Sequence, residues 1–534
     1  MSSIQNINII PEPAFMDIFS GKFILTEDTI IYSDQELLKL SKYLSNILFP
    51  ATGFNLNVKE TKDESDNGIS INLKLIDSKQ ELGFEGYNIE ISAKSINIIA
   101  HYSAGIFYGI QTLRQLLPPE IENKARVEGI EWLIPCLKIK DYPRFSWRGF
   151  MLDEARHFHG KEIVKKMLDL MSLLKLNKFH WHLTDDQGWR IEIKKYPKLI
   201  EIGSKREETV VGGLFSKKHD GVPHSGYYSQ DDIKEIIKYA SDRFIQIIPE
   251  IDLPGHTRAA LASYPNLSCK GYPFRVSTHW GIHRDILCIG KEEVFEFVQN
   301  VLKEIADLFP AKIIHIGGDE VVKRRWKECL DCQLRLQNEG LKTVRELQPY
   351  FTNRLLSFLI NYNQKIIIWN DALNENLNGK MICQYWVRHM KRIFEHIKKG
   401  GDVIMTNYKY TYLDHSYSFT PLKMAYKFEP IPKKLEEKYH KRILGLEAPL
   451  WSEYVPNIKR LEWQTFPRLI AFAETGWTPK IKKNFKSFQN RLKYFLKRFD
   501  IIGINYATFR EVKSNVLKRL FKVLTLPTEQ KGGT

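Results

Sequence analysis

Eight short apolar runs between residues 146 and 451, most of them followed by a stretch of helical periodicity, constrain the fold of this chain most strongly. The runs are SWRGFMLD, NKFHWHLT, FIQIIPEI, AKIIHIGG, QKIIIWN, KMICQYW, DVIMTN and ILGLEAPLW. Alternation of strands with helices is typical of a parallel sheet. Eight such units favour a closed (β/α)₈ TIM barrel over an open sheet. We therefore predict an α/β fold built on this barrel.

The first 140 residues have a different pattern, which predicts a small α+β domain. Alternating segments indicate strands in GISINLKLI and YNIEISAKSINIIA, and helical spacing appears in DQELLKLSKYLSNIL and AGIFYGIQTLRQLL. The segment LLPPEIENKARVEG predicts an exposed connection. Because 534 residues exceed one ordinary core, we divide the chain into a small domain at 1–140, the barrel at 141–500 and a basic C-terminal tail at 501–534.

The net charge of +16 is concentrated near the end of the chain, where residues 480–534 contain 14 Lys or Arg against 3 Asp or Glu. A basic tail can contact nucleic acid or an anionic membrane. The segment FKSFQNRLKYFLKRF, however, spaces its apolar residues as an amphipathic helix does. We favour a packed helical face and expect no nucleic-acid partner.

Two further patterns concern location. No run of 18 apolar residues occurs, so a membrane span is not expected. The N-terminal residues MSSIQNINIIPEPAFMDIF do not have a basic start followed by an apolar core, as a signal peptide does. A cytoplasmic location is therefore expected.

The motif HIGGDE at residues 315–320 places two carboxylates side by side directly after a buried run. Successive strand residues point to opposite faces, so Asp319 and Glu320 can serve one site only if the backbone leaves strand geometry. Gly317 and Gly318 would permit that departure. Adjacent acids repel, so one of them is expected to hold a proton near neutral pH. A tuned acid beside an ionised one is an arrangement suited to acid–base catalysis.

Other chemically capable side chains also follow the predicted strands. Active sites of (β/α)₈ barrels lie at the carboxyl ends of the strands, so these side chains should meet at one rim. Tryptophans among several acids would make a flat-walled site rich in acceptors, which suits a sugar. The predicted rim residues are Arg156, Asp185, Asp252, His256, Asp319, Glu320, Trp369, Trp386, Tyr412, Asp414, Trp451 and Glu453.

Taken together, several stretches resemble family 20 of the glycoside hydrolases, the β-N-acetylhexosaminidases. The matching segments are GFMLDEARHF, LNKFHWHLTDDQGWRIEI, IIPEIDLPGHTRAAL, IHIGGDE and LGLEAPLWSE, and the N-terminal part is similar to the family's small non-catalytic domain. The resemblance implies a retaining exo-glycosidase that removes terminal, non-reducing, β-linked N-acetylglucosamine or N-acetylgalactosamine from a glycan. It implies no metal and no other cofactor. The preferred sugar, the natural glycan and the oligomeric state stay open.

The resemblance also implies a role for each rim residue. In this family the 2-acetamido oxygen of the sugar attacks the anomeric carbon and forms an oxazolinium intermediate. Glu320 would be the general acid, Asp319 would orient the acetamido N–H, and Tyr412 would bind the acetamido oxygen. Trp369, Trp386 and Trp451 would enclose the acetyl methyl group, and Arg156, Asp414 and Glu453 would bind ring hydroxyls. Asp185 and His256 would form a relay behind Glu320. Asp252 would support Asp319.

Two alternative functions are compatible with parts of the sequence. His180 and His182 share one face of a predicted strand and could bind zinc in a metal-dependent barrel hydrolase. A catalytically inactive carbohydrate-binding relative is the second alternative. No later strand end offers a clear histidine set, and Glu320, the acid that inactive relatives usually lose, is present. We therefore favour the glycosidase.

Cysteine spacing gives a weaker signal. Cys329 and Cys332 form a CxxC motif, but a structural zinc site normally needs a second ligand pair, and none has the usual spacing. We predict reduced thiols without a metal there. Cys269 and Cys288 bracket one loop and could form a disulfide, with free thiols as the alternative.

Overall fold

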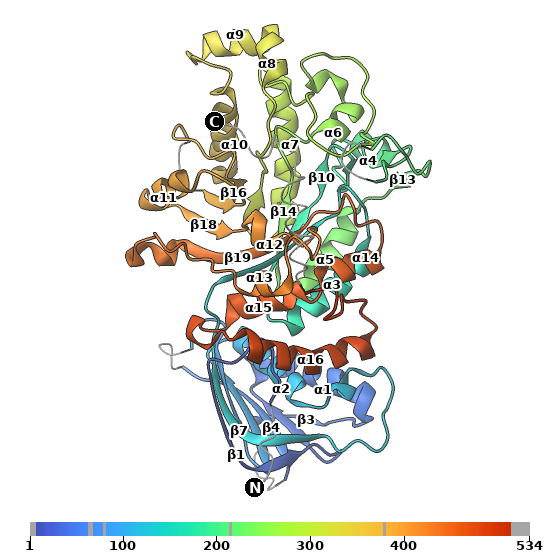
Figure 1. Cartoon of the computed structure of the whole chain (residues 1–534), viewed down its shortest axis with the longest axis vertical. Coiled ribbons are helices and arrows are strands. Elements are labelled where there is room, and N and C mark those ends of the chain that lie inside the picture. The colour runs from blue at the N-terminus through green and yellow to red at the C-terminus, as the bar shows by residue number, and fades with distance from the viewer. Residues whose placement is uncertain (1–6, 62–67, 78–81, 213–215, 378–380, 514–534) are drawn as a thin grey trace.

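All eight apolar runs form strands of one closed barrel in which every neighbouring pair is parallel (Figure 1). The structure is a computed structural model and describes residues 7–61, 68–77, 82–212, 216–377 and 381–513. The predicted (β/α)₈ barrel is confirmed. Its strands are β8 (Trp147–Asp153), β9 (Lys178–His182), β14 (Gln246–Glu250), β15 (Ile313–His315), β16 (Lys365–Trp369), β17 (Ile382–Tyr385), β18 (Asp402–Met405) and β19 (Ile443–Leu450).

Helices cover the outside of the barrel, because strands of a closed parallel sheet must be buried on both faces. Between β16 and β17 the described residues contain no helix. Each of the other connections contains at least one. The principal helices are α3 (Lys161–Leu173), α5 (Gln230–Ser241), α7 (Glu292–Leu308), α10 (Leu347–Asn361), α11 (Met390–Lys398), α13 (Leu422–Tyr426) and α15 (Arg468–Trp477).

Inside the barrel, one layer of side chains is apolar, and the layer closer to the carboxyl ends of the strands is polar. Trp147, Ile248, Ile367, Ile382 and Ile404 all come from barrel strands and form a cluster separate from the large core under the helices. Closer to the carboxyl ends of the strands, buried histidines and glutamates replace them. The apolar cluster thus closes the amino end of the barrel, and polar chemistry is confined to the other end.

The N-terminal part forms a separate α+β domain, as predicted. Its sheet has seven strands in the order β1-β7-β5-β6-β4-β2-β3, and α1 (Leu38–Thr52) and α2 (Ser103–Leu116) pack against it. The strands are β1 (Phe15–Ile24), β2 (Ile30–Ser33), β3 (Val58–Glu60), β4 (Ser70–Leu75), β5 (Tyr87–Ile91), β6 (Ser95–Ala100) and β7 (Leu133–Asp141).

Buried ion pairs join this domain to the barrel. Lys175, which follows α3, lies 3.0 Å from a carboxylate oxygen of Asp141 and 2.6 Å from the Tyr87 hydroxyl. Arg148 of β8 donates to Glu85 at 2.8 Å, and its guanidinium lies 4.9 Å from the Trp477 ring. Breaking one partner of a buried pair is costly, so these contacts fix how the barrel sits on the small domain.

The basic segment near the end of the chain forms α16 (Phe485–Ile502), which lies where the two domains meet (Figure 1). Its apolar face is buried, as expected from the sequence. Arg491 pairs with Glu474 at 2.6 Å, and Arg498 pairs with Glu122 at 3.1 Å. The prediction that residues 116–129 are an exposed connection is wrong in part, because α16 packs on this segment and buries Glu122.

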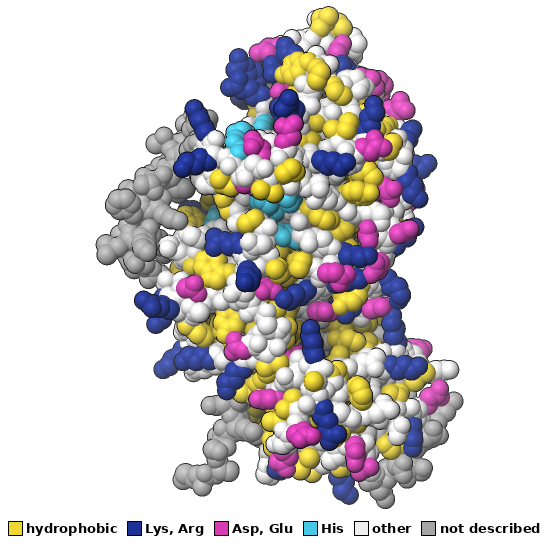
Figure 2. Space-filling model, turned by 90° about the vertical axis from the view of Figure 1, so that its right-hand side faces the viewer, with side chains coloured by type: hydrophobic (Ala, Val, Ile, Leu, Met, Phe, Trp, Pro, Cys, Tyr) yellow, Lys and Arg dark blue, Asp and Glu magenta, His cyan; other side chains and the backbone are white. Residues whose placement is uncertain are grey.

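The positive charge is therefore partly neutralised inside the protein. On the face shown in Figure 2, Lys and Arg side chains are interspersed with Asp and Glu over both domains. Residues 514–534 of the predicted tail lie outside the described residues, and the absence of a nucleic-acid partner stays a prediction. Among the helices that the structure describes, none is both long and apolar enough to cross a bilayer.

The cysteine prediction needs correction. Four thiols from three separate segments lie together, and the six cysteines are all free. The CxxC motif does have a second sulfur pair, because the fold brings distant loops beside it. That pair is Cys269 and Cys288.

Candidate active site

The HIGGDE motif leaves strand geometry directly after β15, as its glycines predict. Gly317 and Gly318 have φ values of +64° and +99°, and Glu320 also has a positive φ of +48°. A Cβ atom on Gly317 would lie 1.7 Å from Asp252 Oδ1, so a larger residue cannot replace this glycine without displacing that carboxylate. The Gly318 N–H donates to the same oxygen at 3.1 Å. The turn therefore presents both acids at the carboxyl end of the barrel.

A chain of paired charges runs from Glu320 into the protein. His256 places Nε2 3.5 Å from Glu320 Oε2 and Nδ1 3.2 Å from Asp185 Oδ1. The other oxygen of Asp185 lies 2.7 Å from the Arg156 guanidinium. Burial alone would keep the imidazole neutral, but the Asp185 carboxylate holds the pKa of His256 well above its usual range. Glu320, whose side chain is 34% exposed, therefore has a protonated imidazole behind it.

Asp319 is held differently, in a pair with Asp252. Asp319 is only 9% exposed. Burial raises its pKa to about 7, with the neighbouring Glu320 adding to the rise and His256 opposing it. Burial and the Asp319 carboxylate raise the pKa of Asp252 well above its usual range. The expected proton near neutral pH is thus held on the Asp319 side of the site.

Because the pKa of Asp319 is raised in the folded chain, the free energy of unfolding should depend on pH. The folded chain holds the proton up to about pH 7, whereas an unfolded Asp loses it near pH 4. Stability is therefore lost as the pH rises from about 4 to about 7. Asp319→Asn, neutral at every pH, should raise the free energy of unfolding by up to about 4 kcal/mol at pH 8, since the folded pKa is higher by about three and each step of one is worth about 1.4 kcal/mol.

Denaturation of both proteins between pH 4 and pH 8 measures this difference, which should shrink steadily toward pH 4. The exposed Asp17 on β1 supplies the control, because Asp17→Asn should give no such trend. A constant difference across the pH range would show that the gain does not come from ionisation of Asp319.

Four aromatic side chains form a continuous wall near the acids. The rings of Trp369 and Trp451 lie 5.9 Å apart, those of Trp451 and Tyr412 6.5 Å, and those of Tyr412 and Trp386 6.3 Å. The Arg156 guanidinium lies 4.8 Å from the Trp451 ring. Tyr412 is 5% exposed, and burial raises its pKa well above the usual range, so its hydroxyl keeps its proton. Such a wall fits a methyl group or the apolar face of a sugar ring.

Two further predicted residues, Asp414 and Glu453, lie near this wall. Burial, together with the charge of Glu453, raises the pKa of Asp414 to about 8. Among the described residues, the buried atoms Asp319 Oδ1, Asp414 Oδ1 and Trp386 Nε1 have no hydrogen-bond partner. Buried polar atoms normally have one, and these three atoms at the rim are available to bond a polar ligand.

Three residues important to this geometry were not among the predicted site residues. Glu250, at the end of β14, accepts from Trp369 Nε1 at 2.7 Å and lies 2.9 Å from His315 Nδ1. Asp186 lies 3.1 Å from His256 Nδ1. Asp371 accepts from the Glu320 backbone and has its pKa raised to about 6, mainly by burial. An ionisable residue inside the apolar run FIQIIPEI was the available signal for Glu250.

The histidines of the zinc alternative have other partners. His180 lies 2.7 Å from Glu447 and 3.0 Å from Glu250 through its two ring nitrogens. His182 lies 2.5 Å from Glu250 and 3.0 Å from Asp185 in the same way. Each ring nitrogen thus faces a carboxylate within the barrel. These contacts hold the buried histidines and carboxylates together beneath the rim. The metal-dependent hydrolase is not favoured.

The fold and the site define a class, the barrel hydrolases that use paired carboxylates. Residues 145–480 match the description "Glycosyl hydrolase family 20, catalytic domain", and residues 6–142 match "Glycosyl hydrolase family 20, domain 2". The chain belongs to glycosyl hydrolase family 20, and the family predicted from the sequence is confirmed.

Individual relatives agree with this assignment. The chain is 40% identical over 515 residues to a β-hexosaminidase of Porphyromonas gingivalis, covering 94% of this chain and 64% of that protein. A solved β-N-acetylhexosaminidase of Streptomyces coelicolor is similar with a TM-score of 0.83 and 31% identity, over 95% of this chain and 99% of the other. An exo-β-N-acetylglucosaminidase of Vibrio harveyi, solved with N-acetylglucosamine, has a TM-score of 0.83 and 32% identity, over 94% of this chain and 78% of the other.

Proposed function

We propose that this chain is a retaining exo-β-N-acetylhexosaminidase that uses the acetamido group of its substrate as the nucleophile. The observation that carries the proposal is the presentation of Asp319 and Glu320 side by side, each with its own support. His256 lies behind Glu320, and Asp252 lies beside Asp319. Adjacent residues on one turn suit substrate atoms that are themselves adjacent, namely the glycosidic oxygen and the acetamido group on the next ring carbon.

In the first step Glu320 gives its proton to the glycosidic oxygen, the role of a general acid. The acetamido oxygen attacks the anomeric carbon as the leaving sugar departs, and a cyclic oxazolinium forms. Asp319 acts here in its ionised form: its carboxylate accepts from the acetamido N–H and stabilises the positive charge that develops. The Tyr412 hydroxyl donates to the acetamido oxygen and directs it toward the anomeric carbon.

In the second step Glu320, now a carboxylate, takes a proton from water. The water attacks the anomeric carbon from the side that the leaving group vacated, so the product keeps the β configuration. The charged His256 lies near Glu320, and Asp185 and Arg156 hold that imidazole in place.

The aromatic wall and the remaining acids would select the sugar. Trp369, Trp386 and Trp451 enclose the acetyl methyl group. Arg156, Asp414 and Glu453 bind ring hydroxyls, and the unpartnered oxygen of Asp414 is available to accept from one of them. The substrate partner is therefore a glycan with a terminal β-linked N-acetylhexosamine. The cytoplasmic location stays a prediction.

A set of aryl β-glycosides with the same leaving group tests this function. We expect turnover of the N-acetylglucosaminide and the N-acetylgalactosaminide, and release of single sugars from the non-reducing end of chito-oligosaccharides. The corresponding glucoside, which lacks the internal nucleophile, should react far more slowly. Similar rates on the glucoside would contradict the acetamido requirement, and binding without turnover would favour the inactive carbohydrate-binding alternative.

A further inference from the structure

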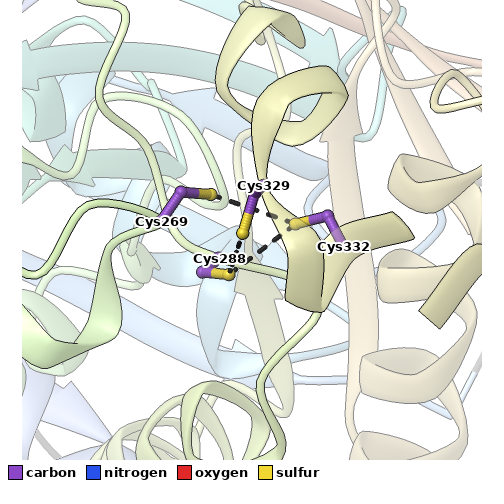
Figure 3. A group of neighbouring side chains, drawn as sticks. All are labelled: Cys269, Cys288, Cys329 and Cys332. Atoms are coloured by element: carbon purple, nitrogen blue, oxygen red, sulfur yellow. Dashed lines mark hydrogen bonds between the residues drawn. The ribbon is translucent and has the colours of Figure 1, made fainter. Parts of the chain in front are cut away.

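Four cysteines outside the active site point their sulfur atoms toward a common centre (Figure 3). Cys269 follows the short helix η4 (Pro265–Leu267), and Cys288 precedes α7. Cys329 and Cys332 lie at the start of α9 (Leu330–Asn338). The Sγ atom of Cys288 lies 3.6 Å from those of both Cys329 and Cys332, and Cys269 Sγ lies 3.9 Å from Cys332 Sγ.

We propose that these four cysteines form a structural zinc site. Zinc binds four thiolates tetrahedrally at about 2.3 Å, which places the sulfur atoms about 3.8 Å from one another. The three distances above match that spacing, and all four sulfur atoms lie within 4.8 Å of one another. Four protein ligands leave no open position, so the site would hold structure and would not take part in hydrolysis.

The four cysteines are largely shielded from solvent, as the ligands of a closed structural site are. Cys288 and Cys332 are completely buried, Cys329 nearly so, and Cys269 partly. Zinc binding displaces the protons of all four thiols and would thereby replace these sulfur–sulfur contacts with metal–sulfur bonds.

The backbone segments that carry the cluster are closely packed against each other. A Cβ atom on Gly290 would lie 2.2 Å from the carbonyl carbon of Asp331 and 2.3 Å from the nitrogen of Cys332. Only glycine allows the loop before α7 to approach the CxxC turn in this way. Arg335 of α9 donates to the Gly290 carbonyl at 3.2 Å, which adds a second connection between the two segments.

The site would join the two loops that carry the acid and its relay. The Leu287 N–H donates to the Pro254 carbonyl at 3.2 Å, two residues from His256. Trp326, buried in α8 (Arg324–Glu328) soon after Glu320, donates to the Leu287 carbonyl at 2.9 Å. A metal at the cysteines would fix these loops relative to each other.

Metal analysis of the full chain tests the proposal directly. The protein is expressed with zinc in the medium and purified without chelator or added thiol-reactive reagents. Elemental analysis should find about one zinc per chain, and zinc X-ray absorption should show four sulfur neighbours at about 2.3 Å. Zinc well below one per chain, iron in its place, or an intact mass lowered by two hydrogens, as a Cys269–Cys288 disulfide requires, would each overturn the assignment.

A matched pair of variants ties the metal to these residues. Replacing Cys329 and Cys332 together by serine should reduce zinc from about one per chain to near zero. Cys136→Ser, at a buried cysteine on β7 in the other domain, should keep the full amount. If the double variant does not fold, stepwise reaction of the parent chain with a mercurial should release the zinc as four thiols react. Release that does not follow the thiols would also contradict the site.

Discussion

Glu320→Gln should lower kcat/KM by about 10²–10⁴-fold on substrates with poor leaving groups, the usual contribution of a general acid. The amide keeps the shape of the side chain but cannot give a proton to the glycosidic oxygen. The loss should be much smaller on aryl substrates with highly acidic leaving groups, which depart without protonation. Steady-state kinetics on a series of aryl N-acetylglucosaminides with different leaving groups measures this dependence.

The control for this change lies a few residues further along the same segment. Glu328 is the last residue of α8, and its side chain is 43% exposed and paired with Arg324 on the surface. Glu328→Gln should leave the kinetics of every substrate unchanged. If Glu320→Gln lowered the rates of activated and unactivated substrates by the same factor, Glu320 would not be the acid.

The barrel and its rim were predictable because parallel strands leave a strong trace in a sequence. Strands buried on both faces read as continuous apolar runs, and the eight runs match the eight strands. Each predicted rim residue from Arg156 to Glu453 lies at or beyond the carboxyl end of a strand. The two glycines before Asp319 indicated the turn, since a positive φ favours glycine. All of this depends on local patterns.

What escaped prediction depends on contacts between distant residues. Glu250 stands within an apolar run, and only the fold shows that His182, His315 and Trp369 surround it. Cys269 and Cys332 are 63 residues apart in sequence, so no spacing rule for zinc ligands brings them together. The burial of Glu122 likewise follows from Arg498, at the other end of the chain.

Asp319→Asn should lower kcat on the N-acetylglucosaminide by about 10²–10³-fold, the usual effect of removing a group that stabilises transition-state charge. An amide cannot balance the positive charge of the oxazolinium. The same change should raise stability at pH 8, because it removes the cost of a buried carboxylate. Loss of turnover together with a gain in stability would separate a catalytic role from a structural one, since a residue that merely supported the fold would lose both.

The underlying mechanism has its own test, because a substrate that supplies the nucleophile forms no covalent bond to the protein. A thiazoline analogue of the oxazolinium should inhibit strongly, as mimics of high-energy states do. Intact-protein mass spectrometry during reaction with a 2-fluoro glycoside bearing a good leaving group should find no adduct. The 2-fluoro sugar slows both steps, so an adduct on either Asp319 or Glu320 would accumulate if one of them were the nucleophile. A trapped adduct would show that this chain uses the ordinary two-carboxylate mechanism. If no adduct forms, the thiazoline inhibits and the acetamido group is required, then Asp319 is not the nucleophile. Its position beside Asp252 then supports the role of a carboxylate that binds the acetamido group.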